Sequence, residues 1–483
     1  MSKREGYIPA KDRKKVLLLC DDIRVHSGVA TMAREFVINS AHKYNWFQVG
    51  AAIRHPDADK KKVIDISDDI NKKFGMEDAD VKILPSNGYG DAQLIRRLMK
   101  EEKPDAIFIF TDPRYWVWLF EIEREVRSKI PIFWLNIWDD FPIPLYNERY
   151  YESVDLLMGI SKQTKLINEL VLGDKAKDKI IEYVPHGIDE EIFRPLAGEF
   201  EKEFAEFKDK LFKGKDIDFV FFFNSRNIGR KHPHDLILAY RLFCDKVGKE
   251  KADKTALIMH TTAVDKHGTD LNAVKAAIAK DRNVFFSQEK LSSAQMNLMY
   301  NVADVTILPS SNEGWGLSLT ESLMAGTMII ANVTGGMQDQ MRFVDHNGEW
   351  FTPSSKVPSN HRKTYTECGN WAEPVFPSNI SIQGSVGTPF IYDDRLAPED
   401  LAEAMNKVYE LPKHVRTKYG QEGREWVTSE EAQMTSKKMS DNIIRCMEKA
   451  WDNFTPRKSF ELHKFEPLED REVEHELINY SYD

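Results

Sequence analysis

Two glutamates in one short segment have the chemistry to hold two different sugars. Glu313 and Glu321 bracket a glycine-containing turn in SNEGWGLSLTESLMAG, the sequence of Ser311–Gly326. A carboxylate accepts hydrogen bonds from sugar hydroxyls, so Glu321 could bind a diol such as ribose and Glu313 a hexose. The structural alternative is that Glu313 is a loop charge and that Glu321 only stabilises the positive end of a helix.

The elements around these glutamates would place a phosphate between them. Val305–Pro309 is an apolar run typical of a buried strand, Ser310–Gly316 is a polar loop, and Leu317–Ala325 has helical character and is closed by Gly326. The first amides of a helix have no internal partners and lie at the positive end of its dipole. The amides predicted to hold a diphosphate are those of Gly316, Leu317 and Ser318.

Cations follow the strand predicted at Phe219–Phe223. Arg226 and Lys231, in NSRNIGRK, come where this strand should end, and could neutralise a leaving diphosphate. Solvated loop cations are the alternative interpretation. Gly28, in HSGVATM, could let the backbone approach a ligand, or could mark a plain turn.

Composition limits the class of protein. With 483 residues, 42% of them hydrophobic, the chain is long enough for two cores, because single cores rarely exceed about 300 residues. The net charge of -10 gives no global attraction to nucleic acid. The apolar run Val16–Cys20 stops at Asp21, too early for a membrane span. Four scattered cysteines fit a reducing compartment, so the chain is predicted to be cytoplasmic.

Short apolar runs alternate with helical stretches along both halves of the chain, which predicts two doubly wound α/β units facing a cleft. The helices expected in the first half are Ala30–Ala41, Ala92–Glu102 and Tyr115–Ser128. The strands expected there are Val16–Cys20, Val49–Ile53, Val81–Leu84, Ala106–Phe110, Ile132–Ile137 and Leu156–Ile160. Those of the second half are Phe219–Phe223, Thr255–Met259, Val284–Ser287, Val305–Pro309 and Thr327–Asn332.

This rhythm predicts the domain boundaries. Residues 1–195 form the first domain, which the C-terminal residues 430–483 complete, and residues 196–429 form the second. Thr352–Thr388, rich in Pro, Ser, Asn and Gly, is expected to be a long surface insertion of the second domain. The acidic stretch Phe460–Asp483 has weak periodicity and is expected to be an extended tail.

Possible metal ligands are present but their spacing does not favour a site. His232 and His234 form an HxH pair for which no third ligand stands at a suitable spacing. The acidic pairs Asp57/Asp59 and Asp78/Asp80 lie in charged, loop-like surroundings and do not follow a strand. No metal and no cofactor are predicted.

Taken together, these motifs resemble the retaining glycosyltransferases of the GT-B fold, and within them family four, the glycosyl transferases group 1. The resemblance covers about residues 16–350 and 390–450. Its most specific part is the pair Glu313 and Glu321, and the Arg226–Lys231 segment supports it. The other matching motifs are YVPHGID followed by Phe193 and Pro195, GISKQT at Gly159–Thr164, and VTGG at Val333–Gly336.

The resemblance implies a nucleotide-diphospho-sugar donor, UDP- or GDP-linked, on the second domain and an acceptor on the first. It assigns catalytic roles to Glu313 at the donor sugar and to Arg226 and Lys231 at the diphosphate. It assigns the ribose to Glu321, and it places Gly28 in the loop that faces the diphosphate. Such enzymes retain anomeric configuration without a metal, which agrees with the lack of a convincing nucleophile and base in the sequence.

The chain departs from the family pattern after the strand Ile132–Ile137. Family members usually carry a histidine there, whereas this chain reads LNIWDDFP. Asn136, Trp138 or Asp139 are therefore predicted to contact the acceptor or the donor sugar. His186 stands where an asparagine is usual, and CDDIRVHSG and FTDPRYW are similar to transferases of tailed phages.

The acceptor stays open at this stage. A glycan or a small glycoside is the default, and the phage-like motifs add a modified base in DNA as an alternative. A second alternative is a non-catalytic protein that binds a nucleotide sugar, because the usual histidine is missing. A sugar-nucleotide epimerase is disfavoured, since the glutamates and the Arg-Lys segment resemble transferases. The sequence predicts no oligomeric state.

Overall fold

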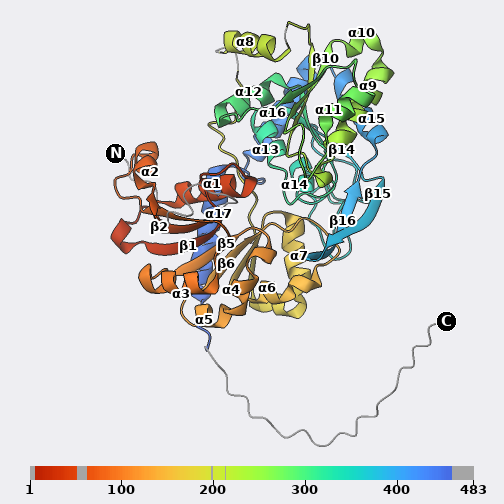
Figure 1. Cartoon of the computed structure of the whole chain (residues 1–483). Coiled ribbons are helices and arrows are strands. Elements are labelled where there is room, and N and C mark those ends of the chain that lie inside the picture. Colours follow the sequence, from red (N-terminus) through yellow and green to blue (C-terminus); the bar gives the residue numbers. More distant parts are fainter. Residues whose placement is uncertain (1–5, 52–61, 197–199, 213, 459–483) are drawn as a thin grey trace, which may run out of the picture.

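The computed structural model describes residues 6–51, 62–196, 200–212 and 214–458. It consists of two α/β domains, each a twisted sheet with helices on both faces (Figure 1). The Asp57/Asp59 pair and the predicted tail Phe460–Asp483 lie outside the described residues.

The first sheet is built from apolar runs that are buried on both faces, as parallel strands between helices must be. It has the strand order β3-β4-β2-β1-β5-β6-β7-β8, parallel except for β3 against β4. Its strands are β1 (Lys14–Asp21), β2 (Tyr44–Ala51), β3 (Ile64–Asp65), β4 (Val81–Ser86), β5 (Ala106–Phe110), β6 (Ile132–Asn136), β7 (Leu156–Gly159) and β8 (Ile180–Tyr183). Its helices are α1 (Gly28–Ser40), α2 (Ser67–Phe74), α3 (Ala92–Glu101), α4 (Val117–Glu121), α5 (Glu123–Arg127), α6 (Glu148–Glu152) and α7 (Lys162–Leu172).

The second sheet repeats this construction with the order β11-β10-β9-β12-β13-β14, parallel throughout. Its strands are β9 (Phe219–Asn224), β10 (Thr255–His260), β11 (Val284–Ser287), β12 (Val305–Leu308), β13 (Met328–Asn332) and β14 (Ala372–Val375). Its helices are α8 (Glu201–Phe212), α9 (Pro233–Val247), α10 (Lys249–Ala252), α11 (Leu271–Ile278), α12 (Ser293–Val302), α13 (Leu317–Met324), α14 (Met337–Met341), α15 (Pro398–Glu410) and α16 (Lys413–Val427).

The last described helix, α17 (Ser436–Asn453), returns to the first domain (Figure 1). Its Trp451 ring lies 5.4 Å from the ring of Tyr44 and 5.1 Å from that of Phe133. The ammonium group of Lys14 lies 4.1 Å above the Trp451 ring. A chain segment from beyond the second domain therefore covers one face of the first sheet.

The segment expected to be a surface insertion is instead partly core. β14 forms an edge of the second sheet against β13, and the buried Trp371 stacks on Trp426 at 5.2 Å. The rest forms a hairpin, β15 (Asn379–Ser385) and β16 (Thr388–Arg395), that extends past the predicted end at Thr388. The high proportion of Pro, Ser and Gly in this segment led to the prediction of a surface loop. Trp371 was the available signal that part of the segment is buried.

The hairpin reaches across to the first domain near α7 (Figure 1). The amide of Tyr392 donates a hydrogen bond to the carbonyl oxygen of Phe141 over 2.7 Å. The hydroxyl of Tyr146 donates to the carbonyl oxygen of Phe390 over 2.8 Å. The two domains are thus bridged by backbone-mediated contacts on this side.

Two of the expected helices and strands differ by more than two residues from those observed. The single helix predicted at Tyr115–Ser128 is divided into α4 and α5, because the backbone leaves the helical conformation at Ile122. β2 begins at Tyr44, five residues before the predicted Val49, because the polar Asn45 and Gln48 are buried within it.

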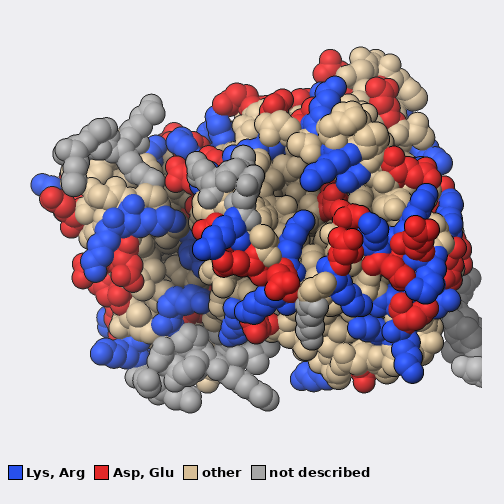
Figure 2. Space-filling view, turned by 90° about the horizontal axis from the view of Figure 1, so that it is seen from above, with Lys and Arg blue, Asp and Glu red and all other residues tan. Residues whose placement is uncertain are grey.

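The surface carries both signs of charge. On the face shown in Figure 2, lysines and arginines are interspersed with aspartates and glutamates. Such a mixed surface produces no extended field of one sign. Among the described residues, none of the helices combines the length and the apolarity needed to cross a membrane.

Candidate functional site

The order of the second sheet brings two motif-bearing loops together. β9 and β12 are hydrogen-bonded neighbours although two strands separate them in the chain. The chain adds strands on one side of β9 and then on the other, so the strand order reverses between β9 and β12. Ligands of doubly wound folds bind at the carboxyl ends of the strands at such a point. The loop after β9 carries Arg226, Arg230 and Lys231, and the loop after β12 carries Glu313.

Glu313 is held by two cations from the neighbouring loop. Arg230 Nη1 lies 2.7 Å from Glu313 Oε2, and Lys231 Nζ bonds Glu313 Oε1. Arg230 also donates to the carbonyl oxygen of Asn312, which fixes the guanidinium against this loop. Glu313 and Lys231 are both buried, so the pair is largely shielded from water.

The ionisation of this pair follows from burial and from the neighbouring charges. Burial alone would raise the pKa of Glu313, but Lys231 and Arg230 hold the pKa below its ordinary value. Burial, together with the neighbouring Arg230, lowers the pKa of Lys231 to about 8. At neutral pH the pair is therefore ionised, with a lysine that is close to losing its proton.

The first domain contributes Asp139 to the same cluster. Asp139 Oδ2 lies 3.7 Å from Arg230 Nη1. A Cβ atom at Gly314 would lie 2.7 Å from the carbonyl oxygen of Ile137 and 3.0 Å from Asp139 Oδ1, so only glycine permits this approach of the two domains. We call Glu313, Arg230, Lys231 and Asp139 the Glu313 cluster.

The predicted phosphate-binding helix start is present and faces the first domain. Gly316, with a φ of 90°, is the residue before α13, so the amides of Leu317 and Ser318 open the helix. A Cβ atom at Gly28, the first residue of α1, would lie 3.2 Å from Leu317 Cδ1. Gly28 and the start of α13 are thus brought together across the domains.

Glu321 lies in the second turn of α13, on the side of β9. The hydroxyl of Tyr300 donates to Glu321 Oε2 over 2.5 Å and accepts from the Asn224 side chain over 2.8 Å. Asn224 is the last residue of β9, so this carboxylate lies beside the loop that carries Arg226. Burial raises the pKa of Glu321 to about 7.

Other predicted residues take different positions. Arg226 is exposed on the loop after β9, and Arg230 takes the place beside Glu313. Asn136 is fully buried and bonds Asn168 over 2.7 Å. The buried Trp138 donates its indole N–H to the carbonyl oxygen of Asp140. Of the three residues predicted where a histidine is usual, Asp139 is therefore the one that faces the cluster.

Sequence reasoning missed Arg230 and Tyr300. Arg230 precedes Lys231 in the same motif, and that adjacency was an available signal. Tyr300 comes from α12, and nothing in its local sequence points to Glu321. His186 is buried between the rings of Phe110 and Trp315, and burial lowers its pKa to about 3.

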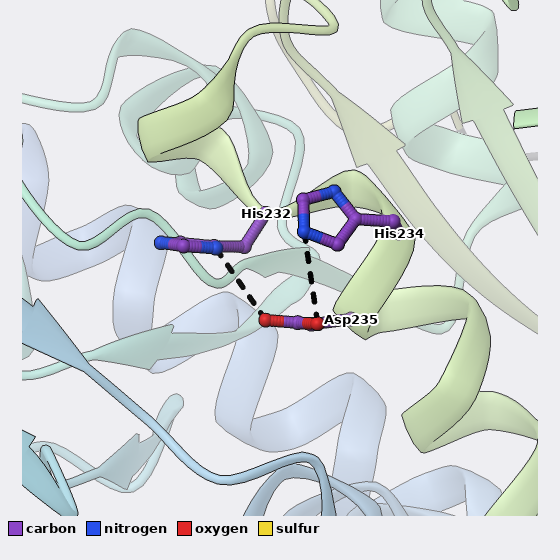
Figure 3. A group of neighbouring side chains, drawn as sticks. All are labelled: His232, His234 and Asp235. Carbon is purple, nitrogen blue, oxygen red and sulfur yellow. Dashed lines mark ion pairs between the residues drawn. The ribbon is translucent and has the colours of Figure 1, made fainter. Parts of the chain in front are cut away.

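The HxH pair does gain a third neighbour. His232 and His234 converge on Asp235, with nitrogen to oxygen distances of 3.4 Å and 3.7 Å (Figure 3). The expectation that no third ligand is available was thus wrong, because the carboxylate comes from the next residue as α9 begins. Asp235 is also bound by Arg395 at 2.8 Å, so its charge is already compensated.

Comparisons with known proteins agree with this architecture. Residues 203–358 match the family model described as "Glycosyl transferases group 1". No curated protein matches the sequence. Among solved structures, the chain is similar to Alr3699/HepE from Anabaena in complex with UDP and glucose, with a TM-score of 0.61, 12% identity and coverage of 90% of this chain and 100% of that one.

Two further structures show the same fold. Sucrose-phosphate synthase from Thermosynechococcus elongatus has a TM-score of 0.61 and 14% identity, and the match covers 91% of this chain and 100% of that one. The α,α-trehalose 6-phosphate synthase from Burkholderia multivorans has a TM-score of 0.61 and 11% identity, covering 91% and 99%. The expected architecture of two Rossmann-like domains is thereby confirmed.

Proposed function

We propose that the chain is a glycosyltransferase and that it transfers a sugar with retention of configuration from a nucleotide-diphospho-sugar. The match of residues 203–358 to the group 1 glycosyltransferase model and the likeness of the whole chain to GT-B structures support this proposal. The donor is UDP- or GDP-linked, and the acceptor is a glycan or a small glycoside held mainly by the first domain. The observation that carries this proposal is the buried Glu313–Lys231 pair beside the start of α13.

The donor would take its place between the glutamates. The amides of Leu317 and Ser318 meet the diphosphate, whose charge Lys231 and Arg226 neutralise. Glu321 accepts hydrogen bonds from the ribose, and Glu313 from the donor sugar. Lys231 is paired with Glu313, so an incoming diphosphate would replace a carboxylate as the partner of this lysine.

The reaction needs no enzymic nucleophile. The bond between the sugar C1 and the diphosphate oxygen breaks, and the acceptor oxygen bonds to C1 on the same face. The acceptor proton passes to the departing phosphate oxygen. Lys231 and the helix amides stabilise the charge that develops on the leaving group, which lowers the barrier directly.

Asp139 is the first-domain residue placed to act next to this reaction. It reaches the Glu313 cluster through Arg230, whereas Trp138 is buried with its indole turned to Asp140. We therefore assign to Asp139 the contact with the donor sugar or the acceptor for which the family uses a histidine. The mixed charges of Figure 2 give no specific support to the alternative of a DNA acceptor.

The experiment is a transfer assay with purified protein, UDP- and GDP-linked sugars and candidate glycans, glycosides and DNA, read by mass spectrometry. We expect a new glycoside whose anomeric configuration, determined by NMR, equals that of the donor. Glu321→Ala should abolish most of the turnover. Donor binding without turnover, conversion of the donor into an epimer, or no loss in Glu321→Ala would each contradict the proposal.

A further inference from the structure

A second group of ionisable side chains is buried between the two domains. Asp140, from the loop after β6, lies with His361 and with Asp394 of β16. One ligand atom from each lies within 4.8 Å of the others. Asp140 and Asp394 are 0% exposed and His361 is 6% exposed. We call these three residues the Asp140 cluster.

The charge of this cluster is not compensated by the protein. In the part of the chain that the structure describes, no lysine or arginine is ion-paired with Asp140 or Asp394. Asp394 has two side-chain neighbours in the cluster. They are His361, whose Nδ1 lies 2.9 Å from Asp394 Oδ2, and the carboxyl of Asp140, with which Asp394 would share a proton if no cation were bound. Two ionised carboxylates in a dry interior repel each other and cost several kcal/mol each unless a cation accompanies them.

One carboxylate oxygen of the cluster has no hydrogen-bond donor among the described residues. Asp394 Oδ1 is buried and accepts no hydrogen bond from the described residues. Buried polar atoms are nearly always satisfied, and an exception calls for an unseen water or ion. With both carboxyls ionised, this unpartnered oxygen and the uncompensated charge point to the same missing cation.

Hydrogen bonds from neighbouring residues hold the side chains of the cluster in fixed orientations, as they do for metal ligands. Asp140 Oδ1 accepts from the amide of Phe141 at 2.8 Å and from Gln163 at 2.7 Å, and Oδ2 accepts from the hydroxyl of Thr334 at 3.2 Å. Gln338 donates to Gln163 at 2.9 Å and to Ser359 at 3.0 Å, two residues before His361. Such outer contacts fix the direction of ligand atoms in metal sites.

We propose that Asp140, His361 and Asp394 bind one divalent cation of the zinc class between the domains. Zinc is bound by imidazole nitrogen and carboxylate oxygen, and two aspartates with a neutral histidine would leave the site with no net charge. A water molecule or the hydroxyl of Thr334, 3.2 Å from Asp140 Oδ2, would complete the coordination. Because all three ligands are buried, the ion would hold the domains together rather than touch a substrate.

This site is preferred to the group of Figure 3 for a physical reason. Asp235 already has Arg395 as a counter-ion, so a cation there would have to compete with a guanidinium. Although both ring nitrogens of His232 are buried without a hydrogen-bond partner among the described residues, a neutral imidazole does not demand a charge. The two carboxylates of the Asp140 cluster do require a compensating positive charge.

The test measures metal in the full-length protein, expressed with added zinc and purified without chelator. We expect about one zinc per chain by elemental analysis. Asp394→Asn should reduce the content roughly tenfold, and Asp140→Asn should do the same. Asp393→Asn is the matched control, because it makes the same change one residue away on β16, where the side chain is partly exposed, and it should keep the metal.

A second measurement uses only the unchanged protein, so it does not depend on whether a variant folds. EDTA should lower the thermal unfolding temperature, and Zn²⁺ alone should restore it. The proposal is overturned if the wild-type protein is metal-free and insensitive to EDTA, which would mean that the two carboxyls share a proton. It is equally overturned if Asp394→Asn keeps its metal while His234→Ala loses it. Neither result depends on a glycosyl-transfer assay.

Discussion

Asp139 and Asp140 are neighbours in the chain but belong to two clusters of opposite character, the first partly buried and the second fully buried. Asp139 joins Glu313, Arg230 and Lys231, where two cations face two carboxylates. Asp140 joins His361 and Asp394, where two carboxylates face one imidazole and no described lysine or arginine is paired with them. Within the described residues, the carboxylates of the first cluster are paired with lysine and arginine, and those of the second are not.

The difference separates a site whose ion pairs a substrate can replace from a site suited to hold a permanently bound ion. In the Glu313 cluster each charge has a partner that a substrate can replace, so the ion pairs can open without leaving a bare charge. In the Asp140 cluster the ligands come from three distant segments and are locked by hydrogen bonds from Gln163 and Thr334. We expect the first cluster to control activity and the second to control stability.

The largest effect should come from Lys231→Ala. The change removes the counter-ion of Glu313 and the charge proposed to stabilise the leaving diphosphate, so kcat should fall by about 10²–10³-fold. The measurement is steady-state transfer at saturating donor. The matched control is Lys266→Ala, since Lys266 is exposed on a loop of the same domain. If both variants kept wild-type kcat, Lys231 would have no catalytic role.

The next effect concerns the Asp140 cluster and should appear in stability rather than activity. His361→Ala removes the buried partner of Asp394, and we expect it to lower the free energy of unfolding by about 2–3 kcal/mol. Denaturant unfolding measures this loss, and the donor KM should change little. The exposed His414 gives the control variant His414→Ala. The prediction is contradicted if both variants lose the same free energy of unfolding, or if His361→Ala raises the donor KM strongly. The Asp140 cluster would then not differ from the Glu313 cluster in controlling stability alone.

The two clusters were not equally predictable from the sequence. Glu313 and Lys231 each follow a strand at a carboxyl end, so the pattern of short strands was enough to expect them in one cleft. Their geometry was not predictable in detail, because Arg226 and Arg230 fit the loop equally well by spacing. The position of Asp139 depended on the approach at Gly314, which involves both domains.

The Asp140 cluster could not be predicted, for a topological reason. Asp394 lies 254 residues from Asp140, and His361 lies in a segment whose composition indicated a surface loop. Local patterns report period and turn chemistry, but not which distant loops a domain interface brings together. The same limit explains why the packing of β14 into the second sheet was missed. In contrast, the strands expected at Phe219–Phe223 and Val305–Pro309 end within two residues of the observed strands.

A smaller effect is expected from the ionisation of Glu321. Its pKa is raised by burial to about 7, so the carboxylate that accepts the ribose hydroxyls is formed above that pH and lost below it. The donor KM should therefore rise as the pH falls from 8 to 6. Glu321→Gln stays neutral, so its KM should be roughly tenfold higher and no longer pH-dependent in this range.

Tyr300→Phe sharpens this prediction. The hydroxyl of Tyr300 donates to Glu321 and lowers the carboxyl pKa against the effect of burial. Without this bond the pKa should rise further, and the whole KM profile should move to higher pH. A profile that keeps its midpoint in Tyr300→Phe would show that another group is titrating.

The smallest effect should come from Arg226, and it tests the boundary of the Glu313 cluster. Arg226 is exposed and is not ion-paired in the described part of the chain, so it meets the donor in a solvated position, where a charge contact contributes about 1 kcal/mol or less. Arg226→Ala should raise the donor KM only a few-fold. Arg230→Ala, which strips a cation from Glu313 and from Asp139, should lower kcat more strongly. If Arg226→Ala proved as damaging as Arg230→Ala, the loop after β9 would have to rearrange when the donor binds, and the cluster described here would be a resting arrangement of the site.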